Sequence, residues 1–375
     1  HADATDQWFQ SLAAEVLDDL DGVALLAVGG YGRRELSPLS DIDVVLVHGQ
    51  TVDGADVAEA LWYPVWDRGL KMGYVVVTPD QAAKLLAEEF EWATAFLDTR
   101  LIAGDADLHA QIDELTEALW SSRRDDLLDH LARTVRDRHE QRGDAAFQIE
   151  PHLKEGRGGL RDVHALGWAS RALPGFADDF LARLTPDVDT LLEARIELHR
   201  LTGRRSDILT LDDQDGVAAA LGDANSNELM LRLAQAARRI AWYSDEAWNR
   251  WQRSRAASAS VTGTALAVSV ASPSVTNTSQ LEIEQGLVGI RPGVDVRSDP
   301  LLLLRLAVLA AETGLTMNRD SLGQLARSGV ELDTPWPREA RRLFAALFQT
   351  GRPAITVVED LDQFEDDDGC PDPDN

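Results

Sequence analysis

The stretch GGYGRRELSPLSDIDVVLVH, residues 29–48, joins two glycines to a strand-like segment that begins with two aspartates. The segments VALLAVGG (23–30) and DIDVVLV (41–47) have the apolar, β-branched composition of buried strands. Because side chains alternate between the faces of a strand, Asp41 and Asp43 are expected to point the same way. The stretch therefore predicts two strands, with a glycine turn after the first and a pair of carboxylates on the second.

The pair Asp41 and Asp43 predicts a metal site. Two carboxylates held side by side raise each other's pKa unless a cation lies between them. A hard divalent ion such as Mg²⁺ or Mn²⁺ removes this cost, and two such ions about 4 Å apart can bind both sides of a phosphoryl group during its transfer. We therefore expect Asp41 and Asp43 to be metal ligands and catalytic residues.

The glycine half of the stretch is suited to phosphate. Gly29 and Gly30 have no Cβ, so their backbone N–H groups can approach a phosphate closely. Arg33 or Arg34 can neutralise triphosphate oxygens, and Ser40 can donate a hydrogen bond to one. The pattern differs from a P-loop, which needs Gly-Lys-Ser/Thr after its glycines. Together the two halves predict a site for a nucleoside triphosphate and its metal ions.

Composition limits the classes of partner. The formal net charge of −28 argues against nonspecific binding of nucleic acid, which requires a basic surface. The single cysteine, Cys370, rules out an internal disulfide bond. The longest apolar run, PLLLLRLAVLAA from Pro300, is broken by Arg305 and too short for a bilayer. We expect a cytoplasmic protein that binds neither nucleic acid nor membranes.

The remaining patterns predict an α+β fold. Helical spacing of apolar residues occupies 7–20 and 55–69, and KMGYVVVTP (71–79) is a third strand candidate. This order suits a small mixed β-sheet covered by helices. From about 79 to 142, and again over 187–253, the spacing is helical throughout.

Three segments resemble one family. GGYGRRELSPLSDIDVVLVH is similar to the signature of the DNA polymerase β-like nucleotidyltransferases, and in detail to that of the bacterial protein-PII uridylyltransferases. PHLKEGRGGLRD (151–162) and LTGRRSDILTLDDQDGVAAALG (201–222) resemble two further stretches of the same family, in the same order. The resemblance extends loosely from the start of the chain to about Gln363.

The resemblance implies a reaction and a set of site residues. The reaction would transfer UMP from UTP, or AMP from ATP, to a tyrosine of the nitrogen-signalling protein PII. Asp41 and Asp43 would hold Mg²⁺, while Gly29, Gly30 and Ser40 would lie along the triphosphate. A role for Arg33 as a phosphate partner comes from its position alone. By their match to the second segment, Lys154 and Asp162 become additional candidates.

The resemblance also divides the chain. A nucleotidyltransferase domain with a mixed sheet precedes a mainly helical domain, and a charge-poor Ala/Ser/Thr/Val segment then leads to a small helical unit and an acidic tail. The expected bounds are 1–105, 106–255, 256–285 for the linker or loose hairpin, 286–362 for the small helical unit and 363–375 for the tail.

Two departures from the family are visible. Polymerase β-like sites carry a third carboxylate on the next strand, but KMGYVVVT has none, so water or one of Asp98, Glu155 and Asp162 would complete the metal shell. The family's metal-dependent HD hydrolase domain needs a His-Asp dipeptide, and none of the eight histidines precedes an aspartate. We therefore expect attachment of nucleotide without its removal or glutamine sensing.

Two alternatives compete with this hypothesis. The related adenylyltransferase that modifies glutamine synthetase is longer, duplicated and has a carboxylate on the third strand, features that are missing here. A degenerate, noncatalytic regulatory module is supported by the missing third carboxylate and opposed by the intact Asp41 and Asp43.

Overall fold

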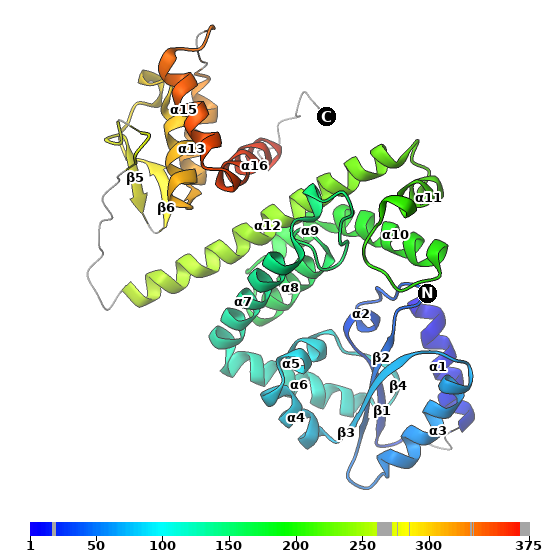
Figure 1. Cartoon of the computed structure of the whole chain (residues 1–375). Helices are drawn as coiled ribbons and strands as arrows, with labels where there is room; N and C mark the ends of the chain where they lie inside the picture. Colours follow the sequence, from blue (N-terminus) through cyan, green and yellow to red (C-terminus); the bar gives the residue numbers. More distant parts are fainter. Residues whose placement is uncertain are drawn as a thin grey trace. The chain divides into compact units, whose positions relative to one another are not determined.

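The computed structural model describes residues 1–16, 20–260, 272–275, 277–284, 286–330, 332 and 334–367. The chain divides into two compact units, His1–Ser244 and Asp245–Asn375 (Figure 1). None of the helices in the described part is long and apolar enough to cross a membrane. The α+β class expected from the sequence is confirmed.

The first unit is built on a four-stranded mixed sheet of order β3-β2-β1-β4. Its strands are β1 (Val23–Ala27), β2 (Ile42–His48), β3 (Met72–Val77) and β4 (Arg100–Gly104). β1 is antiparallel to β2 and β4, whereas β3 is parallel to β2. The first three strands lie where the sequence patterns placed them. The expectation of continuous helix from 79 to 142 is wrong at β4, because this short strand completes the sheet edge beside β1.

Helices cover both faces of this sheet (Figure 1). On one face lie α1 (Ala2–Val16) and α3 (Gly54–Asp67), and on the other α4 (Pro79–Glu88) and α6 (Ala106–Ser122). Alternate residues of the central strands enter two separate cores, with Leu25 in one and Leu26 in the other. The sheet is therefore buried on both sides, and its polar side chains gather at the strand ends.

The glycine turn after β1 is a short helix, α2 (Gly29–Gly32), and Asp41 directly precedes β2. Gly29 has φ +56°, a conformation that a residue with a Cβ rarely adopts. A Cβ on Gly32 would overlap the carbonyl of Asp98 in the 3₁₀ turn Phe96–Asp98. The two glycines therefore let the chain turn sharply at the end of β1 beside this 3₁₀ turn.

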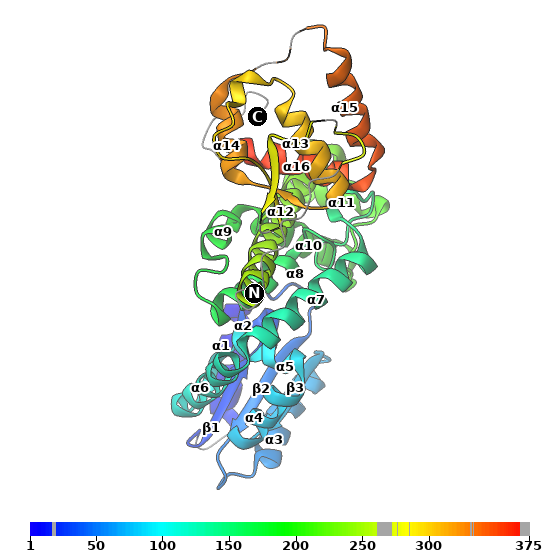
Figure 2. The same cartoon turned by 90° about the vertical axis from the view of Figure 1, so that its left-hand side faces the viewer.

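A helical region follows within the first unit. Its helices are α5 (Phe90–Ala95), α7 (Arg124–Arg142), α8 (Leu160–Ala172), α9 (Asp178–Arg183), α10 (Thr185–Thr202), α11 (Leu211–Leu221) and α12 (Ser226–Ser260), with a 3₁₀ turn at Ala145–Phe147. α7 and α8 pack side by side (Figure 2). α12 continues past Ser244, where the second unit begins.

The glycine-rich segment before α8 is a tight packing element. Gly158 has φ +81°, and a Cβ there would overlap the carbonyl group of Ala237 in α12. The first backbone N–H groups of α8 already bond within the segment, from Leu160 to Leu153 and from Arg161 to Lys154. These donors are therefore not available to a phosphate.

The second unit contains a sheet that the sequence patterns did not predict. Its elements are β5 (Leu281–Glu284), β6 (Leu287–Ile290), a 3₁₀ turn at Val296–Ser298, α13 (Leu302–Thr313), β7 (Thr316–Met317), α14 (Arg319–Ser328), α15 (Arg338–Gln349) and α16 (Arg352–Asp367). The strands form a three-stranded sheet of order β5-β6-β7. The helical unit expected at 286–362 thus also contains strands.

The expected linker and tail differ from the structure at their ends. Residues 256–260 extend α12, and 281–284 form β5, so the linker expected at 256–285 is structured at both ends. Its central residues 261–271 lie outside the described residues. Residues 363–367 of the expected acidic tail belong to α16, and 368–375 are not described.

Candidate active site

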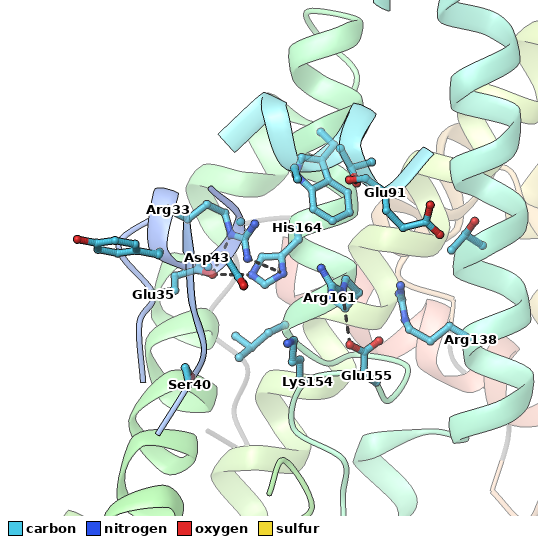
Figure 3. A pocket seen from close by; sticks show the side chains of 18 of the residues that line it. Arg33, Glu35, Ser40, Asp43, Glu91, Arg138, Lys154, Glu155, Arg161 and His164 are labelled. Atoms are coloured by element: carbon cyan, nitrogen blue, oxygen red, sulfur yellow. Dashed lines mark hydrogen bonds and ion pairs between the residues drawn. The ribbon is translucent and has the colours of Figure 1, made fainter. Parts of the chain in front are cut away.

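A cavity of about 550 Å³ opens where the carboxyl end of β1 meets the start of β2 (Figure 3). Residues of α5, α7 and α8, of the glycine-rich segment before α8, and of the loop after α10 complete its wall. All the lining residues belong to the first unit. The cavity brings together residues from all three segments that the sequence singled out.

The two halves of the opening stretch meet at this cavity. Gly29, Gly30, Asp41 and Asp43 all line it, and the backbone N–H of Val28 bonds the carbonyl of Asp43 at 3.1 Å. A Cβ on Gly29 would meet no atom within 4 Å, so the backbone at this glycine is open. The expected proximity of the glycine pair to the two carboxylates is present in the fold.

The two carboxylates interact electrostatically. Partial burial and the negative charge of Asp41 raise the pKa of Asp43, while Arg205 and Lys154 oppose the rise. Among the described residues, no group of three or more His, Cys, Asp and Glu side chains forms a metal cage. Mg²⁺ is commonly bound by one or two carboxylates together with water and substrate phosphates. The donor set therefore fits Mg²⁺ or Mn²⁺ brought in with a nucleotide.

Ser40 presents a hydroxyl without a protein partner. Its Oγ is buried and makes no hydrogen bond with a described residue, although the residue lines the cavity. A buried hydroxyl without a partner is costly unless a ligand satisfies it. This position suits the expected bond from Ser40 to a phosphate.

Arg33 lies in the cavity wall, but carboxylates neutralise its charge. Its Nε donates to Glu35 at 2.9 Å, and its Nη1 pairs with Asp98. These two carboxylates raise the pKa of the Arg33 guanidinium against the effect of burial. Two carboxylates thus share this charge, and the phosphate role of Arg33 stays a prediction.

His164 links Arg33 to Glu35 from helix α8. Its Nε2 lies 2.8 Å from a Glu35 carboxylate oxygen, and its Nδ1 lies 3.3 Å from Nη2 of Arg33 (Figure 3). Burial and the Arg33 charge lower the pKa of His164 to about 3, whereas His164 and Arg33 lower the pKa of Glu35 to about 2. A neutral imidazole with its proton on Nε2 can accept from Arg33 at Nδ1 and turns its N–H side toward the Glu35 carboxylate.

This buried imidazole predicts a loss of stability in mild acid. An unfolded histidine is protonated near pH 6.5, whereas His164 in the fold stays neutral down to about pH 3. Between these values the unfolded chain binds more protons, so the free energy of unfolding falls as the pH falls. From pH 6.5 to pH 5 the loss is about 2 kcal/mol. The depressed pKa of Glu35 adds a loss only below about pH 4.5.

Urea unfolding at pH 7 and pH 5 measures this effect. His164→Gln removes the titrating group, so this variant is expected to lose about 2 kcal/mol less than the wild type over the interval. An equal loss in the two proteins would contradict the assignment of a buried neutral His164.

Lys154 and Arg161 extend from the glycine-rich segment and the start of α8 into the cavity (Figure 3). Lys154 forms no ion pair with a described residue, and burial together with Arg161 lowers its pKa. Arg161 lies over the ring of Trp168, with Nε 3.5 Å from Glu155. Lys154 is thus a cation of the cavity that interacts with Asp207 and Glu155 at a distance but forms no ion pair with a described residue.

Asp162 and Asp98, two candidates for a third metal ligand, lie outside the cavity lining. Asp162 is fully buried; its carboxylate accepts from Arg138 and from the Gly158 N–H, and lies 2.8 Å from His139 Nε2. Asp98 pairs with Arg33 and accepts from Trp168 Nε1 at 2.8 Å. Both carboxylates have structural partners, which contradicts a place in the metal shell.

The third candidate for a metal ligand, Glu155, lines the cavity.

The third strand, β3, has no carboxylate beside Asp43. Gly73 of β3 is the direct partner of Asp43 in the parallel register, and a Cβ on Gly73 would overlap the Asp43 carboxylate. The strand position nearest to Asp43 is thus occupied by a residue without a side chain.

Sequence reasoning missed several lining residues. Arg205 forms an ion pair with Asp41, and Arg195 and His164 also line the cavity. α5 and α7 contribute Phe90, Glu91, Thr94, Ala95, His130, Leu131, Thr134, Asp137, Arg138 and Gln141. The GRRSD segment was the only local signal for Arg205. It did not indicate a site residue, because an arginine beside a turn can have many roles.

The mixed sheet thus places an Asp-x-Asp pair beside a glycine-led helix at a cavity that is also lined by Lys154 and several arginines. The family model of the GlnD PII-uridylyltransferases matches residues 126–179 and 175–248. The chain is also 38% identical to the bifunctional uridylyltransferase/uridylyl-removing enzyme of Streptomyces coelicolor, over 96% of this chain and 44% of that protein.

Two proteins of the same name are also similar. The one from Mycobacterium tuberculosis is 32% identical over 96% of this chain and 45% of its own length. The one from Corynebacterium glutamicum is 31% identical over 91% of this chain and 48% of its own length. The chain therefore spans less than half the length of these relatives. Nearly the whole chain is similar to these bifunctional uridylyltransferase/uridylyl-removing enzymes.

Proposed function

We infer that this chain transfers UMP or AMP from a nucleoside triphosphate to a tyrosine of the PII protein and releases pyrophosphate. The observation that carries the inference is the carboxylate pair, in which Asp41 raises the pKa of Asp43 at the mouth of the cavity. Two carboxylates that repel each other beside an open glycine backbone suit a metal-bound triphosphate. The names of the similar proteins support uridylyl transfer.

Each site residue then has a role. Asp41 and Asp43 would hold Mg²⁺ or Mn²⁺, which when bound neutralises charge on the α-phosphate and on the leaving pyrophosphate. The backbone at Gly29 and Gly30 and the hydroxyl of Ser40 would bind triphosphate oxygens. Lys154, which forms no ion pair with a described residue, would contribute a positive charge.

The proposed reaction is an in-line displacement. The tyrosine oxygen forms a bond to the α-phosphorus, the bond between this phosphorus and the bridging α,β-oxygen breaks, and the tyrosine proton passes to solvent. Because little covalent chemistry is left to the protein, the site acts by positioning and by electrostatic stabilisation.

The test uses the PII protein of Streptomyces coelicolor, the source of one relative. We expect incubation with this chain, Mg²⁺ and either UTP or ATP to attach one nucleotide to a PII tyrosine, which peptide mass spectrometry locates. The preferred nucleotide decides between UMP and AMP transfer. Unmodified PII with both nucleotides would contradict the proposed function.

A further inference from the structure

α10 packs against the segment that leads to Asp41 and also holds the loop that follows it, residues 203–210. His199 Nδ1 lies 2.6 Å from the carbonyl oxygen of Pro38, and Arg195 Nη1 donates to Ser37 Oγ at 2.7 Å. Arg195 Nε also donates to Asp207 Oδ1 at 2.6 Å. His199 and Arg195 are buried. The loop and the segment 37–41 are therefore held together by buried polar groups.

The same loop is also bound to the glycine-rich segment. The Leu153 N–H bonds the Asp207 carbonyl at 2.8 Å, and the Leu209 N–H bonds the Pro151 carbonyl at 3.0 Å. The loop is consequently held by backbone bonds to the glycine-rich segment and by the side-chain bond from Arg195 of α10 to Asp207. A side chain carried by this loop has a defined position at the cavity mouth.

Arg205 is the cavity-lining side chain of this loop. It forms an ion pair with Asp41, and 54% of its side chain remains exposed, compared with 29% for Asp41. The four other cavity arginines have different partners: Glu35 and Asp98 for Arg33, Asp162 for Arg138, Glu155 for Arg161 and Asp207 for Arg195. Those partners lie apart from the Asp41–Asp43 pair, whereas the partner of Arg205 belongs to it.

A divalent cation at Asp41 would neutralise the carboxylate charge that holds Arg205 and would repel the guanidinium. Loading of the site therefore weakens this ion pair and favours a move of the guanidinium toward the triphosphate. A guanidinium offers paired N–H donors in a planar fork that matches phosphate oxygens. Because the Arg205 side chain is long and half-exposed, it can change partners without movement of the anchored loop.

We propose that Arg205 is a nucleotide-binding residue that exchanges Asp41 for the β- or γ-phosphate when the metal-bound nucleotide enters. This deepens the proposed function and rests on it for the identity of the ligand. It also gives a role to the GRRSD part of the third sequence segment. In the nucleotide-free protein, Arg205 then acts as a competitor of the divalent cation for Asp41.

Two titrations of Arg205→Ala test the exchange, with Arg204→Ala as the matched control. Arg204 is exposed in the same loop, so its removal changes the net charge equally. In nucleotide-free protein, the electron paramagnetic resonance signal of Mn²⁺ is expected to show several-fold tighter binding to Arg205→Ala than to Arg204→Ala. Calorimetry with Mg²⁺ and UTP or ATP is expected to show binding to Arg205→Ala that is weaker by about 10- to 100-fold.

The exchange predicts that Arg205→Ala raises the affinity for Mn²⁺ and lowers the affinity for the nucleotide. Equal Mn²⁺ affinities in the two variants, absence of Mn²⁺ binding to both, or equal nucleotide affinities would each overturn it. Neither titration contains PII. If Arg205→Ala binds Mn²⁺ more tightly and nucleotide more weakly than Arg204→Ala, but the wild-type chain does not modify PII, only the proposed transfer is refuted. If the wild-type chain modifies PII but the two variants have equal affinities, only the exchange is refuted.

Discussion

Asp43→Asn is expected to lower nucleotide transfer to PII about a thousandfold or more, without loss of folding stability. The rate falls because an amide leaves the metal-bound triphosphate without one of its two carboxylates, and electrostatic groups of this kind carry most of the catalysis in phosphoryl transfer. The variant keeps the shape of the side chain, so packing around β2 is unchanged.

The sign of the stability change follows from the pKa of Asp43. Partial burial and Asp41 raise this pKa in the fold, so the ionised carboxylate is less favourable in the folded than in the unfolded chain. The cost appears as the pH rises through the unfolded value and persists at neutral pH. Without metal, Asp43→Asn should therefore unfold at the same urea concentration as the wild type, or at a slightly higher one.

Asp162→Asn provides the contrast. Its carboxylate is fully buried between Arg138, His139 and the Gly158 N–H, and the interactions with these groups lower its pKa. Removal of one partner from a buried ion pair costs about 3–5 kcal/mol. Urea unfolding and initial transfer rates of both variants separate the two roles. If Asp43→Asn transferred nucleotide at the rate of the wild type, the site assignment would be refuted.

The second large effect is expected for Gly158→Ala, which should destabilise the first unit by about 3 kcal/mol. The left-handed φ of +81° costs a residue with a Cβ about 1–2 kcal/mol. Overlap of the new Cβ with the Ala237 carbonyl adds a packing cost of about 1–3 kcal/mol, because α12 must move. The same movement disturbs the Gly158 N–H bond to Asp162.

Gly167→Ala in α8, the helix that follows Gly158, is the control. A Cβ on Gly167 meets no atom within 4 Å, and alanine is a better helix former by about 1 kcal/mol. Urea unfolding should show a lower midpoint for Gly158→Ala and an unchanged or higher one for Gly167→Ala. A Gly158→Ala midpoint equal to that of the wild type would contradict the packing described here.

Local patterns in the sequence were enough for three of the four strands of the first sheet and for the two halves of the opening stretch. β1, β2 and β3 each have a run of apolar, β-branched residues, and such a run is itself the physical cause of a buried strand. β4 was missed because RLIAG is short and follows α5 without a strong turn signal. β5 and β6 were missed for a similar reason, since their four-residue runs flank a single glycine turn.

The partners of the site's cations could not be predicted. Arg33 and Asp98 are 65 positions apart in the chain, and Arg205 and Asp41 are 164 apart, so no local pattern connects them. The expected phosphate role of Arg33 rested on its nearness to the glycines in sequence. Tertiary packing instead placed Asp98 and Glu35 against it. Such pairings depend on how helices dock, which sequence periodicity does not encode.

The most direct test of the central claim compares two labels in the reaction of the wild-type chain with PII and Mg²⁺. The nucleoside triphosphate, UTP or ATP, carries radioactive phosphorus either at the α- or at the γ-position. Nucleotide transfer predicts label on PII from the α-labelled substrate only, release of the γ-label as pyrophosphate, and loss of both signals with a chelator. Label on PII from the γ-position, or from neither, would contradict the account.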